Sequence, residues 1–235
     1  WGQYGDRDGG GGVYIVTATA TISGCWIYGN TAEAGGGLAI AMSDAQIIAS
    51  DIYSNTATGV VGGGLAIALG APTVSGNQIH GNNSTGGHGG GLWVMMSGLT
   101  FVDNQVLGNS TDEAGGGLYL ADCAGAVLRG NTIEGNEANF EGGGVALDGG
   151  RRVTAVDSPF EANVAGGDGG GLAARGVEYL AISDNTLNSN SGEHGGGLDA
   201  RTIMSATLSG NVANGNSSRQ EGGAVSVSEG GWIVV

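Results

Sequence analysis

Four side chains that could transfer protons or hold a metal stand at the same place in successive repeats of this sequence: Glu141, Asp168, His194 and Glu221. Each lies four residues before the apolar residue that ends a glycine run. If the repeats stack about 5 Å apart, neighbouring carboxylates raise each other's pKa, and a histidine between acids could serve as general base or metal ligand. The alternative is a structural or solubilising role, because acidic loops are usually solvated.

A second charged group follows the same glycine runs. Asp148, Arg175, Asp199 and Arg201 fall on one face of the strands predicted there, where they can pair across repeats. Such pairs on a surface contribute little stability, and a site for an acidic sugar is the functional alternative.

The elements that position these residues repeat at a fixed spacing. A Gly-Gly-Gly-apolar signature, once Gly-Gly-Ala-Val, recurs at steps of 25 to 27 residues. It ends at Val13, Leu38, Leu65, Leu92, Leu118, Val145, Leu172, Leu198 and Val225. An apolar residue usually follows two positions later, with others near +9 (Ile22, Ile47, Val74, Phe101, Val127) and near +14 (Ile27, Ile52, Ile79, Val106). This pattern predicts three short strands per repeat.

Asparagine forms a column three residues beyond the +14 position. Its members are Asn30, Asn55, Asn82, Asn109, Asn136, Asn163, Asn190 and Asn216. A second column comprises Asn77, Asn104, Asn131, Asn185 and Asn211, with Cys25, Asp51 and Ser158 expected at the corresponding places of other repeats. Because stacked amides bond to each other and to turn backbone, these columns predict asparagine ladders at the bends.

The repeats therefore predict an all-β parallel β-helix of eight to nine coils, each coil 25 to 27 residues long. We expect one β-helix domain over residues 1–235, uncapped at both ends, with the glycine runs at a corner.

The pairing of Gly222–Val225 with Phe160-x-x-Asn163, and its variants in the other copies, resembles the repeat of the polymorphic outer-membrane protein family. That family consists of right-handed β-helix surface passengers within the wider pectate-lyase-like superfamily. The resemblance covers essentially the whole chain. It implies a right-handed coil and an extracellular or cell-surface location.

The charge and composition of the chain exclude some classes of binding partner. The formal net charge is −15, and no lysine is present, so nucleic acid is disfavoured. No apolar run approaches the length of a membrane span.

No cofactor is expected. Calcium is the one ion for which acidic loop residues could supply oxygen ligands: Glu33, Asp112, Glu113, Glu137 and Glu141. Cys25 and Cys123 belong to coils about 19 Å apart, so we expect free thiols.

Two surfaces suggest function. Trp1 and Tyr4 occupy the place of a +14 segment one coil earlier, so these residues and Trp232, Ile233 and Val235 are expected to stack the ends of two chains. A second, apolar strip comprises Tyr14, Val16, Trp93, Met95 and Tyr119, and it is expected to make lateral contacts unless the N-terminal segment covers it.

We therefore expect an extracellular structural protein that self-assembles head to tail into filaments. The alternative is a carbohydrate-active enzyme, or a polysaccharide-binding or adhesin passenger domain, that uses the histidine and acid column or the arginines. An ice-binding face ranks last, because threonine is not aligned along the strip.

Overall fold

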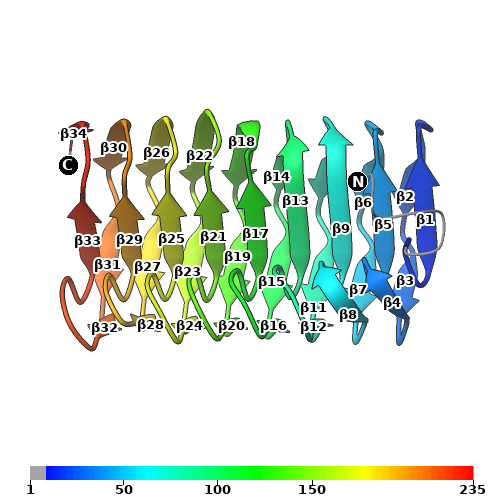
Figure 1. Ribbon diagram of the computed structural model, residues 1–235, viewed down its shortest axis with the longest axis horizontal. Helices are drawn as coiled ribbons and strands as arrows, with labels where there is room; N and C mark the ends of the chain where they lie inside the picture. Colours follow the sequence, from blue (N-terminus) through cyan, green and yellow to red (C-terminus); the bar gives the residue numbers. More distant parts are fainter. Residues whose placement is uncertain (1–8, 235) are drawn as a thin grey trace.

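The computed structural model describes residues 9–234, which form a continuous parallel β-helix. Its coils lie side by side along the long axis of the molecule (Figure 1). Strands pair in parallel with their equivalents in the coils before and after, as in the pairings of Val13 with Leu38 and of Leu65 with Leu92. Residues 9–234 contain no helix that is long and apolar enough to cross a membrane.

Four sheets run along the coil axis, and we name them A to D in chain order. Sheet A comprises β1 (Val13–Val16), β5 (Leu38–Ala41), β9 (Leu65–Gly70), β13 (Leu92–Ser97), β17 (Leu118–Ala121), β21 (Val145–Asp148), β25 (Leu172–Arg175), β29 (Leu198–Arg201) and β33 (Val225–Ser228). Sheet B comprises β2 (Thr21–Ser23), β6 (Gln46–Ile48), β10 (Thr73–Ser75), β14 (Thr100–Val102), β18 (Ala124–Arg129), β22 (Arg152–Val156), β26 (Tyr179–Ser183), β30 (Ser205–Ser209) and β34 (Trp232–Val234).

Sheet C comprises β3 (Trp26–Tyr28), β7 (Asp51–Tyr53), β11 (Gln78–His80), β15 (Gln105–Leu107), β19 (Thr132–Glu134), β23 (Pro159–Glu161), β27 (Thr186–Asn188) and β31 (Val212–Asn214). Sheet D comprises β4 (Thr31–Ala34), β8 (Thr56–Val61), β12 (Asn83–Ser84), β16 (Ser110–Thr111), β20 (Glu137–Ala138), β24 (Val164–Ala165), β28 (Ser191–Gly192) and β32 (Ser217–Ser218). Sheet D adds a fourth strand per coil to the three expected. Its strands are mostly two residues long, too short to produce an apolar alternation in the sequence.

The core is a set of apolar columns, one residue deep, along the coil axis. Leu38, Leu65, Leu92 and Leu118 form one such column from sheet A, and all four are fully buried. The expectation for Val127 was wrong: Phe101 pairs with Leu128, which is fully buried, while Val127 is exposed. From the fifth coil onward the connection from sheet A to sheet B is one residue longer, which moves the inward position from +9 to +10.

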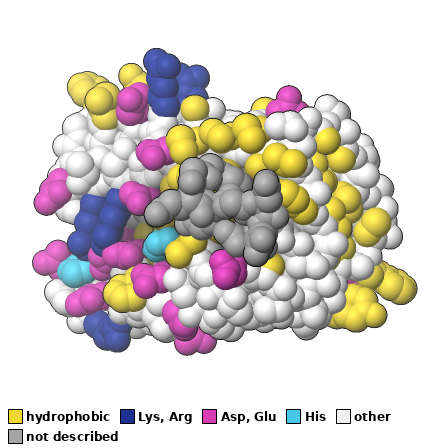
Figure 2. Space-filling model, turned by 45° about the vertical axis from the view of Figure 1, so that its right-hand side comes forward, with side chains coloured by type: hydrophobic (Ala, Val, Ile, Leu, Met, Phe, Trp, Pro, Cys, Tyr) yellow, Lys and Arg dark blue, Asp and Glu magenta, His cyan; other side chains and the backbone are white. Residues whose placement is uncertain are grey.

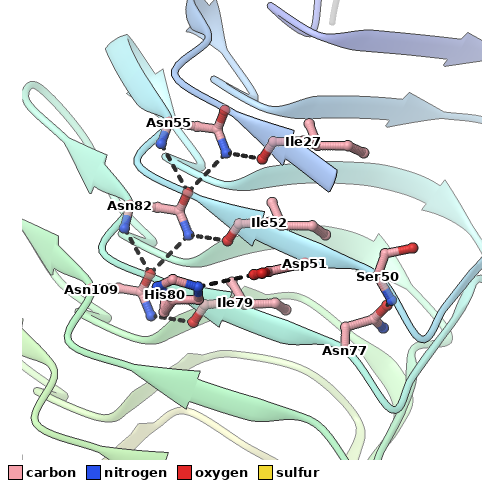
Figure 3. A network of polar contacts seen from close by, with 10 residues as sticks. All are labelled: Ile27, Ser50, Asp51, Ile52, Asn55, Asn77, Ile79, His80, Asn82 and Asn109. Carbon is pink, nitrogen blue, oxygen red and sulfur yellow. Dashed lines mark hydrogen bonds and ion pairs between the residues drawn. The ribbon is translucent and has the colours of Figure 1, made fainter. Parts of the chain in front are cut away.

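The first asparagine ladder is present as predicted, between sheets C and D (Figure 3). Asn82 is representative: its Oδ1 accepts hydrogen bonds from both the backbone N–H and the Nδ2 of Asn55, at 3.0 Å each. Its own Nδ2 donates to the Ile52 carbonyl at 2.9 Å and to Asn109 Oδ1 at 3.0 Å. One side chain thus satisfies the turn backbone of the preceding coil and joins three coils.

The second ladder lies between sheets B and C and is interrupted at Ser158. There the serine hydroxyl accepts from the backbone N–H of Asn131, but it offers no acceptor to Asn131 Nδ2, which bonds only to the Phe101 carbonyl. The expectation for Asp51 was wrong by one residue. Ser50 occupies the ladder and donates its backbone N–H to Asn77 Oδ1, whereas Asp51 lies on β7 and pairs with Gln78.

The glycine runs form the corner between sheets D and A, where successive coils approach closely. At Gly90 an added Cβ would lie 2.4 Å from the Gly116 carbonyl oxygen of the next coil. A side chain at this position would separate the coils, which explains why glycine recurs here.

We expect Ser158→Asn to stabilise the protein. The new amide can accept from Asn131 Nδ2, as its neighbours in the ladder do, and it should raise the free energy of unfolding by about 1 kcal/mol. Urea unfolding measures the change. Ser158→Ala is the matched control and should lower stability, because the Asn131 N–H then loses its acceptor. If Ser158→Asn is no more stable than Ser158→Ala, the ladder is not continuous at this coil.

Candidate functional site

The outer face of sheet A is covered on one side by the ends of sheet D strands and the segments that lead from them to sheet A. Ala34 and Val61, the last residues of β4 and β8, and Ala114, which follows β16, pack against outward-facing residues of the sheet. Those residues are Ala66, Ala68, Trp93, Tyr119 and Ala146, and together the eight form an apolar cluster separate from the core. These strand ends and connecting segments therefore form a wall along one side of the sheet.

This wall buries part of the apolar strip that the sequence predicts to be exposed. Tyr14 and Val16 are 47% and 38% exposed, as a free surface requires, but Trp93 and Tyr119 are only 7% and 8% exposed. Met95 is half-buried and packs against the same cluster. The strip is thus not a continuous exposed face for lateral contacts or for ice. Whether the N-terminal segment covers it depends on residues 1–8, which lie outside the described residues.

Between the wall and the sheet lie two recesses that share His88 and Tyr119. The first, of about 410 Å³, is lined mainly by apolar residues, including Val60, Trp93 and Met95. The second, of about 220 Å³, leads on to Glu141, Asp148 and Arg175. Together they form a groove along sheet A, which we call the sheet A groove.

The two shared residues hold each other in place. The rings of His88 and Tyr119 stack with their centroids 4.2 Å apart, and His88 Nδ1 accepts a hydrogen bond from the Ala114 backbone N–H. The Tyr119 hydroxyl donates to Asp148 Oδ2 at 2.9 Å. Burial and this bond to Asp148 raise the pKa of Tyr119, so the phenol stays protonated and remains a donor.

At the polar end of the groove, Asp168 is the centre of a charge network. One carboxylate oxygen, Oδ1, lies 2.7 Å from His194 Nδ1. The other, Oδ2, meets Arg175 Nη2 at 2.9 Å and Arg201 Nη2 at 3.1 Å. Arg175 also pairs with Glu141 at 2.7 Å. Figure 2 shows acidic, basic and histidine side chains gathered on one part of the surface, beside hydrophobic ones.

The network sets the protonation of its members. Burial opposes ionisation of Asp168, but the His194 hydrogen bond and the charges of Arg201 and Arg175 outweigh it, so the pKa of Asp168 lies below its ordinary value. The same bond raises the pKa of His194, against a smaller effect of desolvation. Both groups are therefore charged together over a wider pH range than in water.

Asp199 is the most buried acid of the network, with no exposed side-chain surface. Its Oδ2 lies 2.9 Å from Arg201 Nε, in an ion pair that lacks hydrogen-bond alignment. Burial raises the pKa of Asp199, and the nearby Ser226 hydroxyl and the Arg201 charge only partly offset this.

The predicted pairing of Arg175 and Arg201 with Asp148 and Asp199 across coils was wrong: across coils Arg175 pairs with Glu141 and Arg201 with Asp168. Asp199 pairs with Arg201 of its own strand, and Asp148 accepts from Tyr119 instead.

The structure brings together three of the four acid and histidine residues singled out in the sequence. Asp168 and His194 touch directly, and Glu141 joins them through Arg175. Glu221 is exposed, and among the described residues its side chain forms no hydrogen bond or ion pair with this network. Asp168, His194 and the arginines bond mainly to one another, which fixes the wall to the sheet at this end.

The expected calcium ligands and the two cysteines can be located in the structure. In the part of the chain described, no group of three or more His, Cys, Asp or Glu side chains could hold a metal ion, so the acidic residues considered for calcium are not gathered into a site. Cys25 and Cys123 are both free, and burial raises the pKa of Cys123 to about 11.

The residues expected at the ends lie only partly within the described structure. Trp1, Tyr4 and Val235 lie outside it. Trp232 is 75% exposed on the last strand of sheet B, and Ile233 is partly buried against the core. Around this last coil, Leu187, Leu198, Leu208, Val225 and Val234 line an apolar recess of about 480 Å³.

Comparison with known proteins agrees with the fold. A model of the right-handed β-helix region matches residues 11–168, more than half of the chain, so the protein belongs to this family. No curated protein and no solved structure matches the chain.

Sequence reasoning missed the wall and a basic patch on sheet B. The wall residues Ala34, Val61 and Ala114 stand four residues before the apolar residue that ends a glycine run, as Asp168 and His194 do. The period gives their place in the repeat, but it does not show that this place packs against sheet A. Their small apolar side chains just before the glycine runs were the available signal. The basic patch, Arg151 and Arg152 with Tyr179, lies at the start of strands that the period does predict.

The Asp168 and His194 pair should make stability depend on pH. The raised pKa of His194 contributes stability that is complete below its ordinary value of 6.5 and is lost as pH rises through the folded-state pKa. The lowered pKa of Asp168 contributes stability that is lost only in acid. We expect the urea midpoint of the wild type to fall from about pH 6 to about pH 9, and to fall less in His194→Gln. Equal slopes for both proteins would contradict the pairing.

Proposed function

We propose that this β-helix is an extracellular structural domain whose sheet A groove binds an extended saccharide chain. The observation that carries the proposal is the continuity of the groove. Its aromatic and apolar part, at Trp93 and the stacked pair of His88 and Tyr119, leads directly into a part lined by Glu141, Asp148 and Arg175.

The chemistry of these two parts is complementary to sugars. A pyranose ring has an apolar face that packs on aromatic side chains and hydroxyl groups that bond to carboxylate and guanidinium. The apolar part supplies the first kind of contact and the polar part the second. The groove follows sheet A from β13 to β25, three coil steps or roughly 14 Å, which accommodates more than one ring.

The proposed extracellular location is supported by the resemblance of the repeat to the polymorphic outer-membrane proteins, which favours the cell surface or the extracellular space.

Catalysis on the bound saccharide is the alternative within this proposal. His194 Nδ1 is bonded to Asp168, which orients the ring and leaves Nε2 as the atom for proton transfer. Turnover of a saccharide that His194→Ala abolishes, with binding retained, would establish an enzyme; binding without turnover would establish a binding domain.

A blocking substitution tests the groove. Ala121 lines the apolar recess and is half-buried, so Ala121→Trp should fill the recess without removing a contact. We expect it to weaken binding of oligosaccharides selected from a glycan array by at least about tenfold, or about 1.4 kcal/mol. Val102→Trp, on the outer face of sheet B, is the control and should bind as the wild type does, since Val102 is half-buried and does not line the groove. Binding unaffected by Ala121→Trp would contradict the proposal.

A second candidate function is head-to-tail self-association, which the last coil favours. The apolar recess there exposes Val225 at the end of a core column. The ladder is also polar along its axis, because each asparagine donates its backbone N–H and Nδ2 to Oδ1 of the next coil. In a second copy stacked on this coil, Asn30 Oδ1 would accept from Asn216 as Asn216 Oδ1 accepts from Asn190.

Self-association predicts a concentration-dependent mass. In sedimentation velocity, oligomers of the chain should grow with concentration, and Val225→Glu should abolish them, since a charge would enter the stacked core. Val164→Glu is the control, because Val164 is 44% exposed in the middle of the solenoid while Val225 is 38% exposed. A monomer at every concentration, or oligomers that persist in Val225→Glu, would contradict end stacking.

A further inference from the structure

Sheet B carries a recess that the proposed function does not use. It is lined by Ala124, Gly125, Arg151, Arg152 and Tyr179, from three successive coils, and has a volume of about 430 Å³. None of these residues lines the sheet A groove. The recess lies on the outer face of the sheet, since Val153 and Leu180, the residues after Arg152 and Tyr179, are buried in the core.

A local irregularity makes room for this recess. Ala124 pairs with Arg152 and Ala126 pairs with Val153, so Gly125 is an extra residue in β18, a β-bulge. Gly125 has a φ of 95°, and a Cβ added there would meet nothing within 4 Å. Bulges break the regular surface of a sheet, and this one leaves a floor of two small residues below the arginines.

Arg151 and Arg152 are less neutralised by carboxylates than the arginines of the Asp168 network. Arg175 and Arg201 each lie about 3 Å from buried carboxylates. Arg151 has only Glu178, at 3.5 Å, and its side chain is 78% exposed. Among residues 9–234, no carboxylate forms an ion pair with Arg152. In a chain with a net charge of −15, two adjacent guanidinium groups with free donors are an unusual concentration of positive charge.

Tyr179 gives the recess an aromatic wall and positions one arginine. Arg152 and Tyr179 are paired in register, and the guanidinium carbon lies 5.9 Å from the ring centroid, within cation–π range. Tyr179 is 45% exposed, so its ring is free to contact a ligand. The volume falls in the range of small-molecule sites, about 300 to 1,000 Å³, and is larger than an inorganic anion requires.

We propose that this recess binds a saccharide ring that carries a carboxylate, with the carboxylate on Arg151 and Arg152 and the ring against Tyr179. Guanidinium binds carboxylate with two parallel hydrogen bonds, and the apolar face of a sugar packs on tyrosine. The net negative charge of the protein repels a long polyanion. The ligand is therefore a single uronic acid unit within a mostly neutral chain rather than a polyuronate.

Ligand-observed NMR titration with methyl β-glucuronide and methyl β-glucoside tests this site, because the two probes differ only in the carboxylate. We expect the glucuronide to bind at least tenfold more tightly than the glucoside, and Arg152→Gln to remove that preference. Tyr179→Ala should weaken glucuronide binding severalfold, while Tyr179→Phe should retain it. Arg219→Gln, which removes an exposed arginine elsewhere, should bind as the wild type does.

Three results would overturn the proposal: equal binding of the two probes, a preference that survives Arg152→Gln, or equally tight binding of N-acetyl-aspartate amide, which would indicate an acidic peptide site. Circular dichroism and the urea midpoint of each variant confirm folding, which exposed substitutions should leave intact. Ala121→Trp should not affect glucuronide binding here, so failure of this site and failure of the sheet A groove are distinguishable.

Discussion

Each buried asparagine of the first ladder bonds to the coil before it and the coil after it, and this repeated contact constrains the rest of the structure. The amide of Asn82 accepts from Asn55 and donates to Ile52 and to Asn109, so the bend of one coil cannot shift without breaking bonds in its neighbours. Buried amides that lose their partners cost more free energy than the bonds themselves contribute. The ladder thus fixes the register in which strands of sheets C and D stack.

A fixed register gives the molecule straight columns on every face, and function depends on what the columns carry. On sheet A, the same wall is attached in two ways. At Val61 and Ala114 it packs on apolar side chains of the sheet, and at Asp168 it is held by Arg175 and Arg201. The change from apolar to charged attachment along one groove is what makes the groove suited to a ligand with both apolar and polar groups.

The sequence predicts the fold well because its strongest signals are local and repeat every coil. Glycine where Gly90 meets Gly116, and asparagine at each bend, report directly on the spacing between coils.

The short strands of sheet D and the shift from Val127 to Leu128 were not predictable, because two-residue strands leave no alternation and one added turn residue moves the inward position. Burial of Trp93 and Tyr119 was missed for a different reason: the period aligns the covering residues Val61 and Ala114, but it does not show that they fold over the outer face of sheet A. The column of Asp168 and His194 was found, since both precede a glycine run, but their arginine partners face the same point only once the coils are stacked.

The most direct test of this account compares Asn109→Ala with Asn83→Ala by urea unfolding. Asn109 is buried in the ladder and makes four side-chain hydrogen bonds, whereas Asn83 is half-buried and accepts one bond from Ser110. The account predicts that Asn109→Ala lowers the free energy of unfolding by about 3 to 5 kcal/mol, because the Asn82 N–H and the Ile79 carbonyl lose their partners, and that Asn83→Ala changes it by less than about 1 kcal/mol. Equal losses for the two variants would show that the strands alone, and not the amide ladder, hold the coils in register.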